Sequence, residues 1–501
     1  MANLYQSLEL IRPEIVLSIA LIVLVIFDLI FHVDKKIIPY VALVGLIATG
    51  IFTLLNPQSG FAFQQTNLMG KIGIFAVDSF GNYFKILIII SSILIVLYSF
   101  SSEEINKIQE RIGEYYALIF GMILGMFFIV SATDLILVYL SLELMSLSSY
   151  VLAGFTKLRD RNSEASLKYL IYGAVSSGLM LYGISLIYGL TGSTNFYIVN
   201  MILQIPNANQ FTLAFANVLI FAGIGYKISS VPFHFWTPDV YEGAPITITT
   251  YLSVASKAAG FALLIRFIKT TFVSFSDSFG NWQVISSFDW KTLLIIISIL
   301  TMTLGNFTAL WQNNLKRLLA FSSIAHAGYL LLGVVVFSNG GVLAILIYFF
   351  VYLLMNYGAF LIVMLISNKS GSENIDDYDG LGYTSPLLAV SFVIFLVSLA
   401  GLPPTAGFIG KLYIFIALVD AKMITVAIIA LLNTVVSLYY YVRIVKHMYL
   451  NKPTENTLTV KPNLGNTILT LVLVIPVLVF GIYFQPLVDW AKNSLNILGL
   501  M

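Results

Sequence analysis

Long apolar runs separated by short polar loops recur along the whole chain. A helix needs about 20 mostly apolar residues to cross a bilayer, and each run approaches that length. About fourteen spans are predicted, centred on residues 14–32, 37–55, 83–100, 115–131, 133–154, 166–189, 212–241, 246–268, 291–310, 317–337, 341–367, 384–420, 424–448 and 466–485. Because the loops are short, no sizeable soluble domain fits between them. The pattern predicts an all-α polytopic membrane protein.

Two of the predicted spans are interrupted by prolines. The seventh breaks at "SSVPFHF", which contains Pro232, and the twelfth breaks at "LAGLPPTAGFIGK", which contains Pro403 and Pro404. A helix broken inside hydrocarbon leaves backbone groups unpaired unless protein or a water-filled cavity satisfies them. We therefore predict that helices 7 and 12 are discontinuous and that their breaks lie inside the protein.

The two breaks also reveal a weak internal repeat. Spans four to eight and nine to thirteen each hold five segments, and the fourth member of each set is the broken one. Since the offset of five is odd, the two units must have opposite orientations in the membrane, as in transporters with inverted repeats. The predicted organisation is N-terminal helices 1–3 in residues 1–114, a first five-helix repeat in 115–268, a second, inverted repeat in 291–448 and a C-terminal helix 14 in 449–501.

Composition supports membrane insertion and narrows the chemistry. The 501 residues are 59% hydrophobic and only 10% charged, whereas soluble domains carry about 25% charged residues. The formal net charge of +2 comes without a basic patch that would suggest nucleic-acid binding. The chain has no cysteine, which excludes disulfides, thiolate iron–sulfur ligation and cysteine-bound zinc within it. The apolar N-terminal run lacks a small-residue cleavage site, so we interpret it as a retained span.

Lysine and arginine are distributed unevenly between the loops, and this predicts the orientation. Loops after odd-numbered spans hold Lys35, Lys36, Lys107, Arg111, Lys157, Arg159, Arg161, Lys168, Lys316, Arg317, Lys369, Arg443, Lys446, Lys452 and Lys461. Loops after even-numbered spans hold only Lys71, Arg266, Lys269, Lys291 and Lys422. The odd loops are therefore expected to face the cytoplasm, with both termini on the opposite side.

Four ionisable side chains fall at membrane depth, where each costs about 2.5–3.5 kcal/mol on insertion scales. They are Glu143, Lys227, Lys257 and Lys411. The alternatives are a structural carboxylate for Glu143 and, for Lys227 and Lys411, lysines that reach the interface along their apolar stems. Lys257 has about ten membrane residues on either side, so that explanation fits it poorly. These depths predict that the four groups lie near one mid-membrane plane and face the protein interior.

Buried lysines and carboxylates suit proton transfer. Burial lowers the pKa of a lysine and raises that of a glutamate, while an opposite charge nearby does the reverse. A buried lysine can therefore bind or release a proton as a carboxylate partner approaches or withdraws. We interpret Glu143 and Lys227 as the modulating pair, with Lys257 and Lys411 as onward stations of a proton relay.

Two histidines within spans are further relay candidates, although each is as well explained as a hydrogen-bonded structural residue. His234 lies in the first broken helix, and His326 lies in "SSIAHAGY" of the tenth span, between Lys257 and Lys411 in sequence order.

The remaining charges are expected to be peripheral: Lys85, Lys316 and Arg317 as interfacial lysines or anchors, and Asp239 and Glu242 as groups at the cytoplasmic surface. Tyrosine and phenylalanine are interpreted as packing and lipid-facing residues.

Three motifs resemble a known family. "GYKISSVPFHFWTPDVYEGAP", "NLKRLLAFSSIAHAGY" and "LAGLPPTAGFIGK" are similar to the antiporter-like membrane subunits of complex I, the proton-pumping NADH:quinone oxidoreductase. The resemblance extends over essentially the whole chain. It is strongest to the N branch, because a lysine in the twelfth span disfavours the M branch and a short C-terminal segment disfavours the L branch.

The resemblance implies a function and assigns the buried groups to it. In this family each such subunit is thought to move protons, powered by quinone reduction in a distant part of the complex. The family's glutamate of the fifth span maps to Glu143, and its lysines of the seventh, eighth and twelfth spans map to Lys227, Lys257 and Lys411. No cofactor or metal is implied for this chain, because NADH, FMN, iron–sulfur clusters and quinone belong to other subunits. The implied neighbours are subunits M and K in a bacterial inner (plasma) membrane.

Three alternatives use the same sequence features differently. A subunit of a multi-subunit cation/proton antiporter or of a membrane-bound hydrogenase shares the fold and the buried lysines. A haem protein needs axial ligands from facing helices, and only His234 and His326 lie within predicted spans. A purely structural scaffold leaves four buried charges unexplained.

Overall fold

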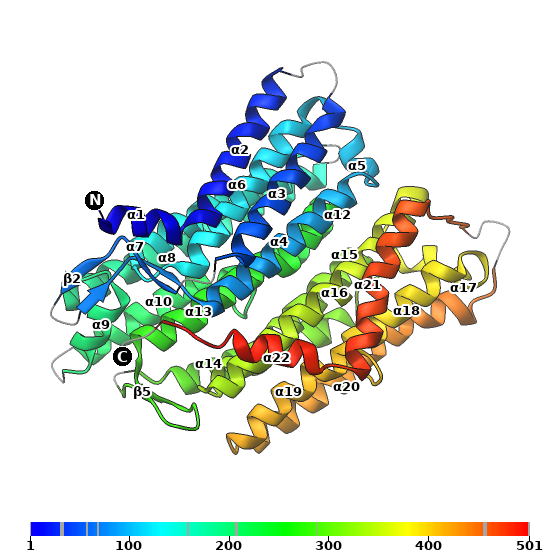
Figure 1. The fold of residues 1–501 in the computed structure, drawn as a ribbon. Helices are drawn as coiled ribbons and strands as arrows, with labels where there is room; N and C mark the ends of the chain where they lie inside the picture. Colours follow the sequence, from blue (N-terminus) through cyan, green and yellow to red (C-terminus); the bar gives the residue numbers. More distant parts are fainter. Residues whose placement is uncertain are drawn as a thin grey trace.

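The computed structural model describes residues 2–30, 35–56, 59–67, 70–157, 160–205, 209–286, 288–453 and 458–498. Within these ranges the molecule is almost entirely helical (Figure 1). Thirteen helical segments are long and apolar enough to cross a membrane. They are α2 (Arg12–Ile30), η1 with α3 (Lys35–Leu54), α4 (Ser79–Ser99), η2 with α6 (Gln109–Ser131), α7 (Leu135–Ala153), α8 (Asp160–Thr191), α10 (Gln210–Ile228), α12 with η3 and α13 (Ile246–Thr271), α14 (Trp290–Ala309), α15 (Leu315–Val335), α16 (Asn339–Ser370), α20 (Ile424–Leu450) and α21 (Leu464–Ile482).

Both predicted helix breaks are confirmed. α10 ends at Ile228, where Ser229 adopts a left-handed φ of 61°, and the shorter α11 (Trp236–Gly243) follows the break. The twelfth predicted span consists of α18 (Pro386–Ala400) and α19 (Ala406–Asp420), each 15 residues long. Neither half spans a bilayer alone, so thirteen candidate spans are found among the described residues where fourteen were expected.

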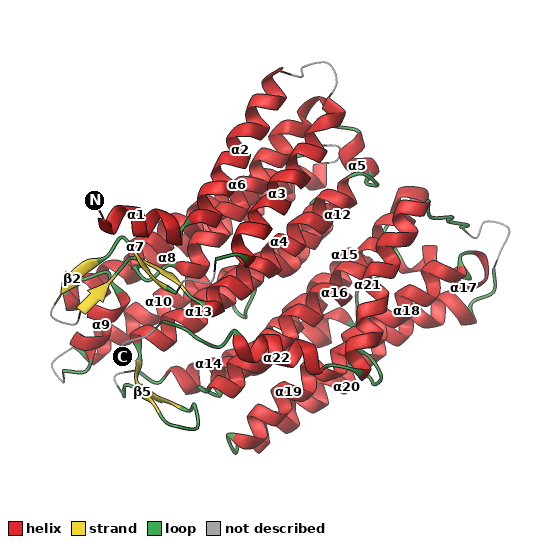
Figure 2. Ribbon diagram, viewed as in Figure 1, coloured by secondary structure: helices red, strands yellow, loops and turns green. Residues whose placement is uncertain are grey.

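The remaining elements are short and lie at the ends of the spans. Figure 2 shows the strands as small hairpins beside the helices. The short helical elements are α1 (Ala2–Leu10), α5 (Glu103–Asn106), α9 (Phe196–Leu203), η4 (Ile375–Tyr378), α17 (Leu381–Thr384) and α22 (Gln485–Asn493). The antiparallel strand pairs are β1 (Gly60–Ala62) with β4 (Phe75–Val77), β2 (Gln65–Asn67) with β3 (Gly70–Ile72), and β5 (Val273–Ser276) with β6 (Trp282–Val284).

Side-chain caps start several of the spans. The Asp78 carboxylate accepts from the Gly81 N–H at 2.8 Å at the start of α4. Asp134 and Asn314 act in the same way for α7 and α15. Each cap satisfies N–H groups that have no partner within the helix, and this fixes where the span leaves the loop.

The helices form two adjacent bundles, coloured blue to green and green to red in Figure 1. Burial separates central helices from peripheral ones. The most apolar stretches of α15 and of the α12–α13 segment are fully buried, whereas only 22% of that of α2 is buried. A helix that is apolar all round and fully enclosed can carry polar groups away from lipid, so α13 and α15 are the places where buried chemistry is to be sought.

Two buried ion pairs link the first helices to the rest of the molecule. Arg266 of α13 donates to both Asp78 oxygens, at 2.6 and 2.8 Å, and both side chains are fully buried. Lys85 of α4 lies 2.6 Å from the Glu14 carboxylate of α2, and both are at most 2% exposed. The expectation that Lys85 reaches the interface is wrong, and Arg266 is not a loop residue. Of the other loop charges used for orientation, Arg159 lies outside the described residues.

The α22 helix joins the two bundles from the later one to the earlier (Figure 1). Its Trp490 ring lies 4.3 Å from Tyr83 of α4 and 5.5 Å from Phe350 of α16, measured between centroids. Beyond α22, the Leu498 N–H donates to Asp78 at 3.1 Å. The segment after α21 therefore closes over the buried Asp78–Arg266 pair.

Candidate functional site

Lys227 lies in the last turn of α10, directly before the first break, and is only 1% exposed. Its Nζ lies 5.4 Å from the ring centroids of three tyrosines, Tyr150, Tyr169 and Tyr226. Among the described residues this Nζ has no hydrogen-bond partner. The aromatic faces attract a cation, so the ammonium group is held by ring electrostatics without a fixed acceptor.

Glu143 lies on α7 and acts on Lys227 electrostatically, without an ion pair between the two. It is only half-buried, beside a row of exposed apolar side chains on the same helix, Leu140, Leu144 and Leu147. Glu143 thus lies at the border between the interior of this chain and the exposed face of α7, and the expectation that it faces the interior stays a prediction. An α7 face that carries a carboxylate at membrane depth needs a covering partner, because a charge in lipid is costly.

Lys257 begins α13 directly after η3 (Leu252–Ser256), which is a π-helical turn. Such turns are rare and often occur at functional sites. The lysine is 1% exposed, and its Nζ donates to Ser323 of α15, at 2.6 Å to Oγ and 2.9 Å to the carbonyl oxygen. One turn further, Gly260 packs against α10 so closely that an added Cβ would lie 3.6 Å from the Cβ of Lys227. Lys227 and Lys257 therefore lie on directly contacting helix faces.

His326 occupies the centre of the later bundle on α15 and is 2% exposed. Its Nδ1 lies 2.7 Å from the Tyr348 hydroxyl and its Nε2 lies 3.3 Å from the Tyr441 hydroxyl. It is one turn from Ser323, and both Lys257 and Lys411 act on it electrostatically. On α15, His326 lies between Ser323, which contacts Lys257, and Tyr329, which contacts Lys411, and its role in a relay stays a prediction.

Lys411 lies on α19 after the second break and is 4% exposed. Its Nζ donates to the Ala400 carbonyl at 2.8 Å, and that carbonyl belongs to the last residue of α18. The Tyr329 ring centroid lies 4.8 Å from the same Nζ. At the break, the Ala400 carbonyl at the end of α18 accepts a hydrogen bond from Lys411. Backbone groups freed inside a membrane protein need such a partner.

His234 is not part of this arrangement. It lies between α10 and α11, is 5% exposed, and its ring contacts Phe235. Its Nδ1 has no hydrogen-bond partner among the described residues. No contact joins it to the described groups around Lys257 or Lys411, so a relay role for His234 stays a prediction.

The charges after the first break form an ionic cluster. Arg317 of α15 contacts Asp239 at 2.7 Å and Glu242 at 2.9 Å, both on α11. Lys168 of α8 also contacts Asp239, at 2.7 Å. Lys316, expected to be a peripheral anchor, is 2% exposed and donates to the Ala244 carbonyl at 2.7 Å. This cluster fixes α11 against its neighbours and keeps the break in place.

Sequence reasoning missed the tyrosines. Tyrosine was interpreted as a packing or lipid-facing residue, yet seven tyrosines contact the buried lysines or His326: Tyr150, Tyr169, Tyr226, Tyr329, Tyr348, Tyr352 and Tyr441. A signal was present, because a buried tyrosine needs a partner for its hydroxyl. That signal does not say which of 28 tyrosines face inward.

Comparison with known proteins identifies relatives of the chain. Residues 132–437 match the family model described as NADH:quinone oxidoreductase/Mrp antiporter, TM. The chain is 49% identical to NADH-quinone oxidoreductase subunit N 2 of Chloroherpeton thalassium, over 97% of this chain and 94% of that protein. It is 45% identical to NADH-quinone oxidoreductase subunit N of Chlorobium chlorochromatii, over 100% and 97%. A chain of respiratory complex I from Thermus thermophilus superposes with a TM-score of 0.78 at 28% identity, covering 95% of this chain and 98% of that one.

Proposed function

Because this chain belongs to the subunit N family of NADH-quinone oxidoreductase, the antiporter-like membrane subunits of complex I, we propose that it carries protons along the buried row from Lys227 to Lys411. It is a proton-translocating subunit of that enzyme. The assignment of these residues rests on one observation. All four members of the row are at most 4% exposed and lie on adjoining helices: Lys227, Lys257, His326 and Lys411.

The first step of the proposed relay is control of Lys227 by Glu143. The tyrosine rings favour the protonated lysine, and an ionised Glu143 favours it further. When the Glu143 charge is neutralised or drawn toward a partner, Lys227 loses that support and releases its proton. The absence of a fixed acceptor on its Nζ, among the described residues, leaves the proton free to move.

The later steps pass through hydroxyl groups. A proton reaching Lys257 lies next to the Ser323 hydroxyl at 2.6 Å. His326 follows one turn along α15, between the Tyr348 and Tyr441 hydroxyls. Hydroxyl groups both donate and accept, so together with water they carry a proton between groups that do not touch. Lys411 receives it at the second break, beside the freed Ala400 carbonyl.

The inverted repeat is part of the proposal, with units in 115–268 and 291–448. The order and lengths of the helices support it. α6, α7 and α8 have 20, 19 and 32 residues, and α14, α15 and α16 have 20, 21 and 32. In each unit the next long helix is a broken one, α10 with α11 in the first and α18 with α19 in the second, and these carry Lys227 and Lys411. Matching broken helices at the repeat interface are how such folds build a mid-membrane site.

The energy for this transfer comes from other subunits. Electron transfer from NADH through FMN and iron–sulfur clusters to quinone is proposed to take place in them, since this chain has no cysteine to ligate a cluster. The half-buried Glu143 face of α7 is where we place a neighbouring membrane subunit, with subunits M and K as the proposed neighbours. The chain is proposed to lie in a bacterial inner membrane with its odd-numbered loops toward the cytoplasm.

Replacing Glu143 by glutamine tests the proposed function. The substitution keeps the side-chain volume and removes the charge that acts on Lys227, so we expect proton uptake driven by NADH oxidation to fall several-fold in inside-out membrane vesicles. The matched control is Glu114→Gln, which removes an exposed carboxylate paired with Arg111. Assembly of both variants is checked by purifying the complex. Normal pumping by an assembled Glu143→Gln complex would contradict the coupling role of this residue.

Replacing Gly401 by alanine tests the role of the second break. Gly401 has φ of +85°, and an added Cβ would lie 2.6 Å from Cδ and 3.3 Å from Nζ of Lys411. The new methyl group must displace the lysine from the Ala400 carbonyl, so pumping is expected to fall several-fold. Gly371→Ala is a matched control, because Gly371 has φ of +72° but no atom within 4 Å of an added Cβ. It imposes the same backbone strain without touching Lys411. Equal effects of the two variants would show that strain alone, and not the lysine, is responsible.

A further inference from the structure

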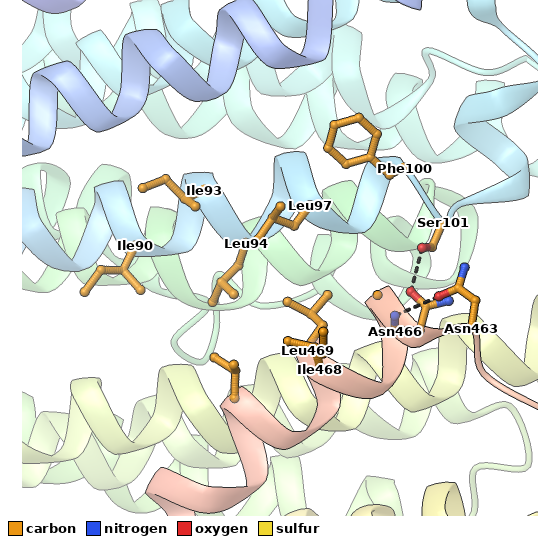
Figure 3. A pocket seen from close by; sticks show the side chains of 12 residues that line it. Ile90, Ile93, Leu94, Leu97, Phe100, Ser101, Asn463, Asn466, Ile468 and Leu469 are labelled. Carbon is orange, nitrogen blue, oxygen red and sulfur yellow. Dashed lines mark hydrogen bonds between the residues drawn. The ribbon is translucent and has the colours of Figure 1, made fainter.

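A long apolar groove lies between α4 of the earlier bundle and α21 of the later one. Figure 3 shows the side chains of both helices facing each other across it. The groove has a volume of about 620 Å³. Its apolar lining includes Ile90, Leu94, Leu97, Ile468, Leu469 and Val472.

The groove has the length of one membrane leaflet. Its lining on α4 and the C-cap residue of that helix runs from Ile90 to Phe100, which at 1.5 Å per residue is about 15 Å. The hydrocarbon core of a bilayer is about 30 Å thick, so one leaflet is about 15 Å. Both helices are candidate membrane spans, and the groove therefore follows one leaflet from the end of α4 to mid-membrane.

One end of the groove is polar and adjoins a second cavity. Ser101 donates to Asn466 at 2.6 Å at this end (Figure 3), and Asn466 and Asn463 line both cavities. The second cavity has a volume of about 470 Å³ and is also lined by Lys369, Lys461 and Glu103. Two lysines and one carboxylate give it a net positive charge.

We propose that this pair of cavities binds an anionic phospholipid, with one acyl chain in the groove and the headgroup between Lys369 and Lys461. The polar cavity lies at the ends of α4 and α16 that are expected to face the cytoplasm, where the leaflet is rich in anionic lipid and each nearby basic residue adds attraction. The carboxylate of Glu103 lies at the exposed edge of the same cavity and reduces the net charge by one.

The bound lipid has a mechanical role in the fold. Across the groove, the described hydrogen bond between α4–α5 and α21 is that of Ser101 with Asn466, at its polar end. The apolar remainder leaves the two helices apart, and an acyl chain between them supplies the missing packing contacts. The lipid thus completes the seam between the earlier and later bundles at the cytoplasmic side. This inference does not depend on the proton relay.

Photo-crosslinking of the purified complex tests the proposal. The complex is placed in phosphatidylcholine nanodiscs that contain a small fraction of phosphatidylglycerol with a diazirine in its acyl chain, or of phosphatidylcholine labelled in the same way. After irradiation, mass spectrometry identifies the labelled peptides. One net positive charge predicts about fivefold more labelling of the α4 and α21 groove by phosphatidylglycerol than by phosphatidylcholine.

Two pairs of variants test the headgroup site and the acyl-chain groove separately. Lys369→Gln with Lys461→Gln is expected to abolish the preference for phosphatidylglycerol, whereas Lys452→Gln, an exposed lysine that does not line the cavity, keeps it. Ile468→Trp fills the groove and lowers labelling by both lipids, while Ile475→Trp, exposed on α21 outside the groove, does not. Equal labelling of the wild-type groove by the two lipids, or labelling of the groove by neither lipid, would overturn the proposal.

Discussion

Replacing Lys257 by methionine is expected to lower proton pumping by about a hundredfold or more, the loss typical of removing an acid–base group, in a complex that still assembles. Methionine keeps the length and apolar stem of the side chain and removes only the titratable group. Burying an unpaired ammonium group is costly, so its loss does not endanger the helix bundle. Tightly coupled quinone reduction should fall together with pumping. The measurement is proton uptake in membrane vesicles, compared with the amount of assembled complex.

The arginine variant distinguishes a proton station from a structural lysine. Arginine is effectively never deprotonated, so Lys257→Arg should also impair pumping although it keeps the positive charge near Ser323. A structural lysine predicts the opposite order, with arginine tolerated and methionine damaging to assembly. Lys269→Met is a matched control on the same helix, because Lys269 lies over the Trp282 ring and outside the row. Normal pumping by an assembled Lys257→Met complex would refute the relay role of this residue.

Removing the charge of Asp78 is expected to have the largest effect on stability. Asp78→Asn keeps a side chain that can cap α4 but leaves Arg266 charged, fully buried and without its carboxylate. Breaking such a pair costs about 3–5 kcal/mol. We expect a large fall in the thermal midpoint and yield of the purified complex.

The double variant Asp78→Asn with Arg266→Met shows whether the unpaired charge is the cause. Replacing both charges of a buried pair is often close to neutral, so the double variant should recover most of the lost stability. Glu9→Gln is the control, since the Glu9–Arg12 pair is about half exposed and such surface pairs contribute at most about 1 kcal/mol. If the single and double variants are equally unstable, packing around Arg266 matters more than its charge.

Sequence patterns correctly predicted where along the chain the helices break and that Lys257 is buried. The breaks near Pro232 and Pro403 were correct because proline removes a donor and blocks the helix locally, whatever surrounds it. Lys257 was correctly predicted to be buried, since a lysine with about ten apolar residues on each side cannot reach water. These properties depend only on distance along the chain.

Which face a residue occupies could not be predicted in the same way. Central helices such as α16 are apolar all round, so no polar stripe shows which side faces the protein. Glu143 therefore appeared buried, although it borders an exposed face of α7. Lys85 appeared to be interfacial because its partner, Glu14, is 71 positions away in a different span. Pairing between distant spans is a property of the packed bundle.

The crossing of α22 has a consequence for the order in which the protein matures. Asp78 and Leu498 are 420 positions apart, yet the Leu498 N–H donates to the Asp78 carboxylate. During synthesis earlier segments generally fold first, so the helices around Asp78 are in the membrane long before α22 emerges. The ribosome must deliver almost the whole chain before this contact can form. Closure over Asp78 is therefore a late step in the maturation of the protein, and a chain that stalls before Leu498 lacks this contact to the carboxylate.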